Sequence, residues 1–157
     1  MRSAHMTRAE QPSPQAEPAR LAKLAIVVSR GTSNNLFQVA TLVRAATALE
    51  ATVEVLFRDA ALLKLERVRI NEPQWSPTYA AVASSLAERM RAADFTDMET
   101  FLRDAKHHGD AVALWASSQT LRREGVGLDQ LIPLLDGERD ENDFLAEART
   151  ADALLTF

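Results

Sequence analysis

Hydrophobic residues in this chain gather in short continuous runs that alternate with segments of helical periodicity. The first run, 24–28, is apolar and rich in β-branched residues, as is typical of a parallel strand covered on both faces. Similar runs at 52–57, 111–116 and 153–157 predict three more strands. Strands that alternate with helices predict an α/β domain with a mainly parallel sheet.

The segment after the first strand has the pattern of an amphipathic helix. Apolar positions from Leu36 to Ala46 follow a 3.6-residue spacing, and Ser33 or Asn34 is available as the N-cap. Together with the strand at 52–57, this helix completes a βαβ unit, which implies a right-handed crossover.

The middle of the chain carries weaker signals. Residues 60–66 can form two turns of helix, and the proline-containing segment 67–77 is predicted to be an irregular loop. A stripe of apolar positions then predicts one amphipathic helix over 79–90. Its members are Tyr79, Val82, Leu86 and Met90.

The second half repeats the plan of the first. A helix over 96–108 is the best marked, because Thr96 and Glu99 have the spacing of a capping box and Gly109 follows as a stop. After the third strand we expect a short helix ending near Gly125, a helix or turn at 129–135, and a helix over 140–150. The acidic run 136–143 is predicted to be a solvated loop that enters this last helix.

Length and composition indicate one domain. The chain has 157 residues, 46% of them hydrophobic and 25% charged, which is enough for one sizeable core. The first 20 residues contain three prolines and no apolar periodicity, so they are predicted to be a disordered tail before a domain at 21–157. Part of this tail, around 1–6, is compatible with a vector origin.

Charge and hydropathy exclude some partners. A formal net charge of -4 provides no basic field for a phosphate backbone, so we expect no nucleic acid partner. No window reaches the roughly 20 apolar residues of a membrane span, and the N-terminus lacks the apolar region of a secretory signal. We therefore expect a cytoplasmic protein without a membrane partner.

Polar segments follow three of the predicted strands. Because ligands of open parallel sheets bind beyond the carboxyl ends of the strands, the segments 30–35, 58–59 and 117–120 are expected to share one rim. Backbone N–H groups around Gly31 could hold a carboxylate, phosphate or sulfur oxyanion, with Arg30 supplying charge. The candidate binding residues are Arg30, Gly31, Thr32, Ser33, Asn34, Asn35, Ser117, Ser118 and Gln119. The alternative is that Gly31 only permits a tight turn and that the polar residues only cap helices.

Other side chains give little support for catalysis or metal binding. Ser117 would need a base, but His107 and His108 are expected at the opposite end of its strand, about 20 Å away. This histidine pair lacks an acidic cluster with ligand spacing, so we expect neither a metal nor a cofactor. Trp75 and Tyr79 are candidates for stacking on a planar ligand, whereas Trp115 is expected in the core or in a subunit interface.

The order of these segments resembles proteins of the DsrE/DsrF-like family, particularly the branch associated with sulfur-oxidation gene clusters. In the first half the resemblance is carried by 24–57, with its strand, Gly31 turn, alanine-rich helix and second strand. In the second half it is carried by the spacing from Trp115 to Gly125 and by the acidic segment before the last helix and strand. The resemblance implies a three-layer flavodoxin-like or Rossmann-like sandwich of four to five strands.

The resemblance also implies assembly as a homotrimer or hexamer, and persulfide chemistry on a cysteine at a strand end. Ser117 stands at that position, the chain has no cysteine, and a serine hydroxyl forms no persulfide. We therefore expect a non-catalytic, structural or regulatory partner in sulfur transfer or sulfur oxidation, associated with a cysteine-bearing paralogue or a sulfur-carrier protein. The alternative is a small-molecule binding module for an anion or nucleotide-like ligand at the rim. An enzyme that uses Ser117 ranks last, because no base is placed beside it.

Overall fold

Five parallel strands form one sheet in the computed structural model, which describes residues 20–95 and 97–157. The strand order is β4-β3-β2-β1-β5, and every neighbouring pair is parallel. The bounds are β1 Lys23–Val28, β2 Thr52–Phe57, β3 Val112–Ser117, β4 Gly137–Arg139 and β5 Ala153–Thr156. The predicted α/β class with a parallel sheet is confirmed.

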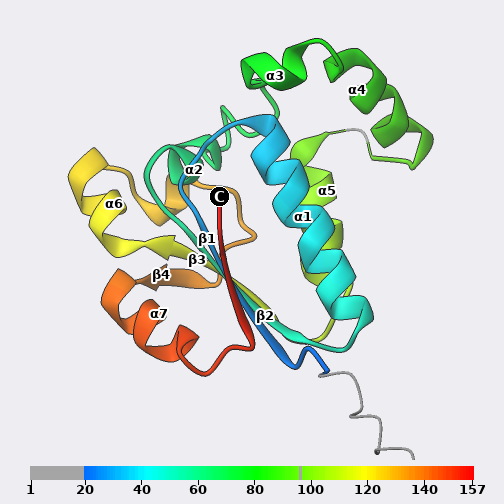
Figure 1. The fold of residues 1–157 in the computed structure, drawn as a ribbon. Helices are drawn as coiled ribbons and strands as arrows, with labels where there is room; N and C mark the ends of the chain where they lie inside the picture. The colour runs from blue at the N-terminus through cyan, green and yellow to red at the C-terminus, as the bar shows by residue number, and fades with distance from the viewer. Residues whose placement is uncertain (1–19, 96) are drawn as a thin grey trace, which may run out of the picture.

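Helices cover both faces of this sheet and complete a three-layer arrangement. Figure 1 shows α1 and α5 side by side on one face and α7 on the other. The helices are α1 Ser33–Ala48, α2 Asp59–Lys64, α3 Pro77–Ala80, α4 Ala83–Ala92, α5 Met98–His107, α6 Ser118–Glu124 and α7 Glu141–Ala148, and Leu128–Gln130 forms a 3-10 turn.

The two faces bury hydrophobic cores of different size. Alternate residues of β1 point to opposite faces: Ile26 joins the large core with α1 and α5, whereas Ala25 joins a small core with Phe144 and Ala148 of α7. Burial on both faces explains the continuous apolar run of β1 and the mostly apolar sequence of β2.

The predicted solvated loop over 136–143 is wrong in two places. Residues 137–139 form β4, which pairs with the end of β3 through Trp115 and Gly137. The carboxylate of Asp136 accepts a hydrogen bond from the backbone N–H of Leu114 at 2.8 Å, so it fixes the entry to β4. Glu141, the first residue of α7, is buried.

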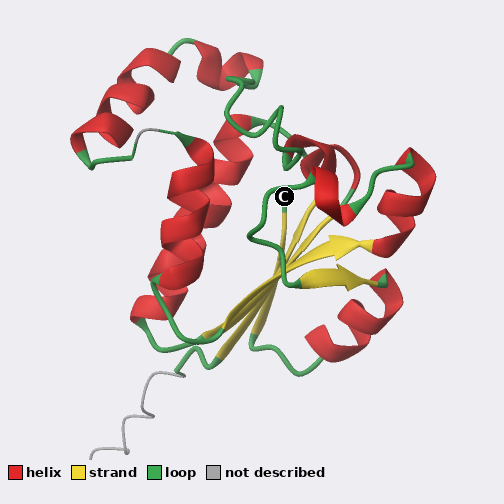
Figure 2. Cartoon of the chain, turned by 180° about the vertical axis from the view of Figure 1, so that it is seen from behind, coloured by secondary structure: helices red, strands yellow, loops and turns green. Residues whose placement is uncertain are grey.

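The predicted helix over 79–90 is also wrong, because the segment forms two short helices, α3 and α4, which we call the arm (77–92). The Tyr79 hydroxyl accepts a hydrogen bond from the Gln38 side chain, whereas Val82 is 46% exposed, so the expected stripe does not pack as one face. Leu86 is the buried residue of α4. The arm stands off from the body of the molecule in Figure 2.

The predicted disordered tail and the predicted capping box at Thr96 concern residues outside the described ranges. The tail is described only from residue 20 onward, and Thr96 is not described. The N-cap of α5 is Asp97, whose carboxylate accepts a hydrogen bond from the backbone N–H of Thr100 at 2.8 Å. This local contact begins the predicted helix at Met98.

Candidate functional site

The three polar segments predicted at strand ends lie side by side. The backbone N–H of Arg58, after β2, donates to the Val28 carbonyl at 2.9 Å. The N–H of Asp59 donates to Thr120 Oγ1 at 3.1 Å, which links the ends of β2 and β3. These contacts bring the segments onto one rim at the carboxyl edge of the sheet, where α/β proteins of this kind bind ligands.

The N-terminus of α1, the predicted anion cradle, is occupied by the chain itself. The backbone N–H of Ser33 donates to the Gln74 carbonyl at 2.7 Å, and Ser33 Oγ accepts from the Gln74 N–H at 2.9 Å. Asn34 Oδ1 accepts from the Ser76 N–H at 3.0 Å. Both Ser33 and Asn34 are buried, so they hold the segment 74–76 and are not presented to solvent.

Gly31 is required by a close approach of two backbone segments. A Cβ atom at this position would lie 2.2 Å from the carbonyl oxygen of Ala60 in α2. The neighbouring Thr32 is the N-cap residue of α1, but its side chain makes no capping hydrogen bond. Asn35 is buried and accepts from Asn34 Nδ2 at 3.2 Å. These contacts favour a structural role for this turn.

A cavity of about 420 Å³, which we call the rim cavity, opens beside this turn. It lies between 29–32 and 60–74, and its cationic lining residues are Arg30, Lys64 and Arg69. Arg30 is exposed, and Arg69 pairs with Glu66 at 3.6 Å. Of the predicted binding residues, Arg30, Gly31 and Thr32 line this cavity, whereas 117–119 do not belong to its described lining.

Lys64 is the most unusual residue of the rim cavity, because it is only 3% exposed. Its Nζ donates to the backbone carbonyl oxygens of Arg69, at 2.7 Å, and of Glu72. Burial lowers the pKa of Lys64, and the nearby Glu72 carboxylate opposes this effect. Sequence reasoning missed both Lys64 and Arg69; the available signal was a lysine inside the apolar run 61–65.

Ser117 lies in a buried polar cluster at the end of β3. The residue is 0% exposed, and its Oγ accepts a hydrogen bond from the Thr120 N–H at 3.0 Å, as the N-cap of α6. The same hydroxyl is hydrogen-bonded to the carboxylate of Glu141, which is 8% exposed. The other carboxylate oxygen of Glu141 has no hydrogen-bond partner among the described residues.

The expectation that no base lies beside Ser117 is therefore wrong, because the Glu141 carboxylate contacts its hydroxyl. Glu141 belongs to the acidic run predicted to be solvated, so the sequence does not indicate it as a base for Ser117. Ser117 is nevertheless sealed from solvent, and its side chain performs the capping role that the sequence predicts. Ser118 is buried as well, whereas Gln119 is exposed.

The remaining candidates are dispersed. His107 and His108 are exposed at the C-terminal end of α5, before β3 begins. Within residues 20–95 and 97–157, no group of three histidine or acidic side chains could hold a metal ion. In the same ranges, no helix combines the length and hydropathy needed to cross a bilayer.

Together these features define a three-layer parallel α/β protein of flavodoxin-like or Rossmann-like architecture. No protein-family model and no curated protein sequence matches the chain. Among solved structures, one similar protein is "Protein of Unknown Function MTH1491 from Methanobacterium thermoautotrophicum". The TM-score is 0.53 and the identity 16%, over 87% of this chain and 99% of that chain. At this identity the likeness shows the fold alone.

Proposed function

We propose that the protein is a non-catalytic member of the DsrE/DsrF-like group that acts as a structural or regulatory partner in sulfur transfer or sulfur oxidation. The observation that carries this proposal is the burial and hydrogen bonding of Ser117. Where the resemblance places a sulfur-carrying cysteine, the side chain is 0% exposed and hydrogen-bonded to Glu141. A sealed hydroxyl provides neither the thiolate nor the access that persulfide transfer needs.

The charge beside Ser117 supports the same proposal. A carboxylate within hydrogen-bonding distance favours a neutral hydroxyl donor and disfavours an anion such as a thiolate. This strand end is therefore suited to a serine that caps α6, and the protein would work through its surfaces.

Association with further copies of the chain or with a paralogue is supported by exposed leucines on the side of the sheet that α7 covers. Leu154 of the edge strand β5, on the face that α7 covers, and Leu145, on the outer side of α7, are each 46% exposed. Apolar side chains on a thinly covered face favour association. We expect a homotrimer or hexamer, or a mixed assembly with a cysteine-bearing paralogue.

Multi-angle light scattering and co-purification test this proposal. The protein should elute as an oligomer, Leu154→Asp should shift it toward the monomer, and Leu128→Asp, at another exposed leucine, should not. Incubation with a persulfide donor should add no sulfur mass, while a sulfur-carrier protein should co-purify with the unmodified chain. A monomer that retains no sulfur-carrier protein would contradict the proposal.

The rim cavity supports a second candidate function, binding of a small anion or nucleotide-like molecule. Arg30, Lys64 and Arg69 line one cavity at the strand ends together with a single acidic residue, Glu72, and exposed Arg30 forms no ion pair with the described residues. Thermal-shift titration with sulfate, thiosulfate, phosphate and adenosine monophosphate tests this candidate. Arg30→Ala should weaken binding about tenfold, whereas Arg122→Ala, an exposed arginine on α6, should not. A flat response to all four compounds would remove this candidate.

A further inference from the structure

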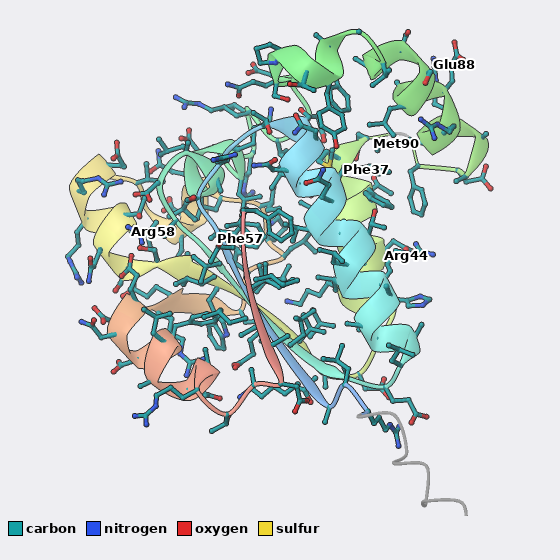
Figure 3. The ribbon with its side chains drawn as sticks, in the orientation of Figure 1. Phe37, Arg44, Phe57, Arg58, Glu88 and Met90 are labelled. Carbon is teal, nitrogen blue, oxygen red and sulfur yellow. The ribbon has the colours of Figure 1, made fainter. Side chains whose placement is uncertain are left out.

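A second cavity separates the arm from the body of the molecule. It has a volume of about 270 Å³ and lies between α4 and the segment 70–75; we call it the arm cavity. Met90 lies on the inner side of α4, which faces the body, whereas Glu88 points outward (Figure 3). Its lining is distinct from the Ser117 cluster and shares only Glu72 with the described lining of the rim cavity.

The walls of the arm cavity are apolar and aromatic. Trp75, Met90, Phe95 and Met98 line it. The ring of Phe95 is held in place, since it packs edge-on against Phe101 at 4.8 Å between centroids. Indole, phenyl and thioether groups are favourable neighbours for a planar ring. Of the aromatic residues that the sequence suggests for stacking, Trp75 is the one that lines this cavity.

Two charged side chains of opposite sign, Arg91 and Glu72, also line the arm cavity. Neither forms an ion pair or a side-chain hydrogen bond with another of the described residues. Two other polar residues of the lining are already engaged: Asn71 Oδ1 accepts from the Glu99 N–H at 3.1 Å, and Ser33 Oγ accepts from Gln74. Arg91 and Glu72 therefore remain as the groups that can orient a ligand.

We propose that the arm cavity binds a small aromatic zwitterion of the amino-acid class. The ring lies among Trp75, Met90 and Met98, the carboxylate of the ligand pairs with Arg91, and its ammonium pairs with Glu72. The volume is just below the roughly 300 Å³ at which pockets for drug-sized molecules begin, so the ligand is small. Because α4 buries little more than Leu86, the arm can move to admit this ligand.

Tryptophan fluorescence provides the binding assay. The chain has two tryptophans, and Trp115 packs in the small core below α7, away from the arm, so Trp115→Phe leaves Trp75 as the reporter. We would titrate L-phenylalanine, 3-phenylpropionate, which lacks the ammonium, and 2-phenylethylamine, which lacks the carboxylate. L-phenylalanine should bind with a dissociation constant of about 1 mM or tighter, and each deletion analogue about tenfold more weakly.

Variants assign the binding to the arm cavity. Ala87→Phe fills the cavity and should abolish the fluorescence change. Arg91→Ala should weaken L-phenylalanine and 3-phenylpropionate about tenfold but not the amine, and Arg89→Ala, a neighbouring arginine outside the described lining, should weaken neither. Glu72→Gln should weaken L-phenylalanine and 2-phenylethylamine, which carry an ammonium group, but not 3-phenylpropionate.

Three results would overturn the proposal. One is the absence of a saturable change with any of the three compounds up to about 10 mM. Another is an equal effect of Arg89→Ala and Arg91→Ala, and a third is a concentration-dependent dimer that Ala87→Phe abolishes, which would assign the cavity to a second copy. Because Arg91 and Glu72 are exposed, their variants remain informative even where Ala87→Phe fails to fold.

Discussion

The carbonyl group of Ala60 leaves no room for a side chain at position 31. The Cβ of Gly31→Ala would meet this oxygen at 2.2 Å and the carbonyl carbon at 2.7 Å, both in backbone that α2 fixes. We expect Gly31→Ala to destabilise the fold by about 2–3 kcal/mol, as measured by urea unfolding. Arg30→Ala, one residue earlier and exposed, should change the free energy of unfolding by less than about 0.5 kcal/mol. Equal stability of the two variants would show that the turn adapts.

At the same scale, the contacts that could be predicted are local and those that could not are distant. Ser117 caps α6 through an N–H three residues away, a spacing that is visible in the sequence. Its contact with Glu141 joins residues 24 positions apart, and nothing in an acidic run indicates which carboxylate becomes buried. The contact at Ser33 could not be predicted for the same reason, because its backbone N–H donates to the Gln74 carbonyl from a different part of the chain.

A helix or strand could be predicted where the apolar pattern of its own sequence indicates which of its side chains are buried. The central strands are mostly apolar because both faces are covered, and the buried Glu54 of β2 is an exception. β4 has the sequence Gly-Glu-Arg, and its pairing with β3 through backbone groups leaves no apolar pattern to detect. In the arm, the helical stripe is present in the sequence, but it has no continuous surface to pack against, so α3 and α4 form in place of one helix.

Helix α7 offers a direct comparison of adjacent side chains. Phe144 is 1% exposed in the small core, whereas Leu145 lies on the outer side of the same helix. We expect Phe144→Ala to reduce the free energy of unfolding by about 3–4 kcal/mol, because it removes a large buried ring from a small core. Leu145→Ala should cost less than about 1 kcal/mol. Chemical denaturation followed by circular dichroism measures both, and similar losses would contradict this docking of α7.

An ion-pair network also attaches α7 to the sheet, and it makes stability depend on pH. Hydrogen bonds from Arg139 and then Lys23 lower the pKa of Glu147. The charged form is thus favoured in the folded state, so the stabilisation is complete above the ordinary pKa of a glutamate and is lost as the pH falls through the lowered value. We expect Glu147→Gln to lower Tm at pH 7 and to lower it by a smaller amount near pH 3.

Glu88→Gln is the matched control for this pH dependence, since Glu88 is exposed on α4 and forms no ion pair with the described residues. Its Tm should follow that of the unmodified protein at both pH values. A constant difference in Tm between Glu147→Gln and the unmodified protein across this range would assign the effect to packing and not to charge.

For the molecule as a whole, stability is unevenly distributed between the sheet and the arm. The sheet contains the fully buried residues of β1 and β2, whereas α3 buries no residue and α4 buries Leu86. Regions with little buried surface open at low free-energy cost. Within residues 20–157, we expect brief trypsin treatment to cut first after Arg89 or Arg91, as read by mass spectrometry of the fragments. A first cut within α1 or α5 would contradict this ranking.

The strand order has a consequence for the timing of folding. Strands β1 to β4 are neighbours in the sheet in the order in which they are synthesised, and each new strand joins the one completed just before it. β5 alone must return to β1, across more than 120 residues of intervening chain. A growing chain can therefore build most of its sheet sequentially, while the free edge of β1 remains unpaired until β5 has been synthesised. During synthesis, this edge is the part of the nascent protein most open to pairing with another chain.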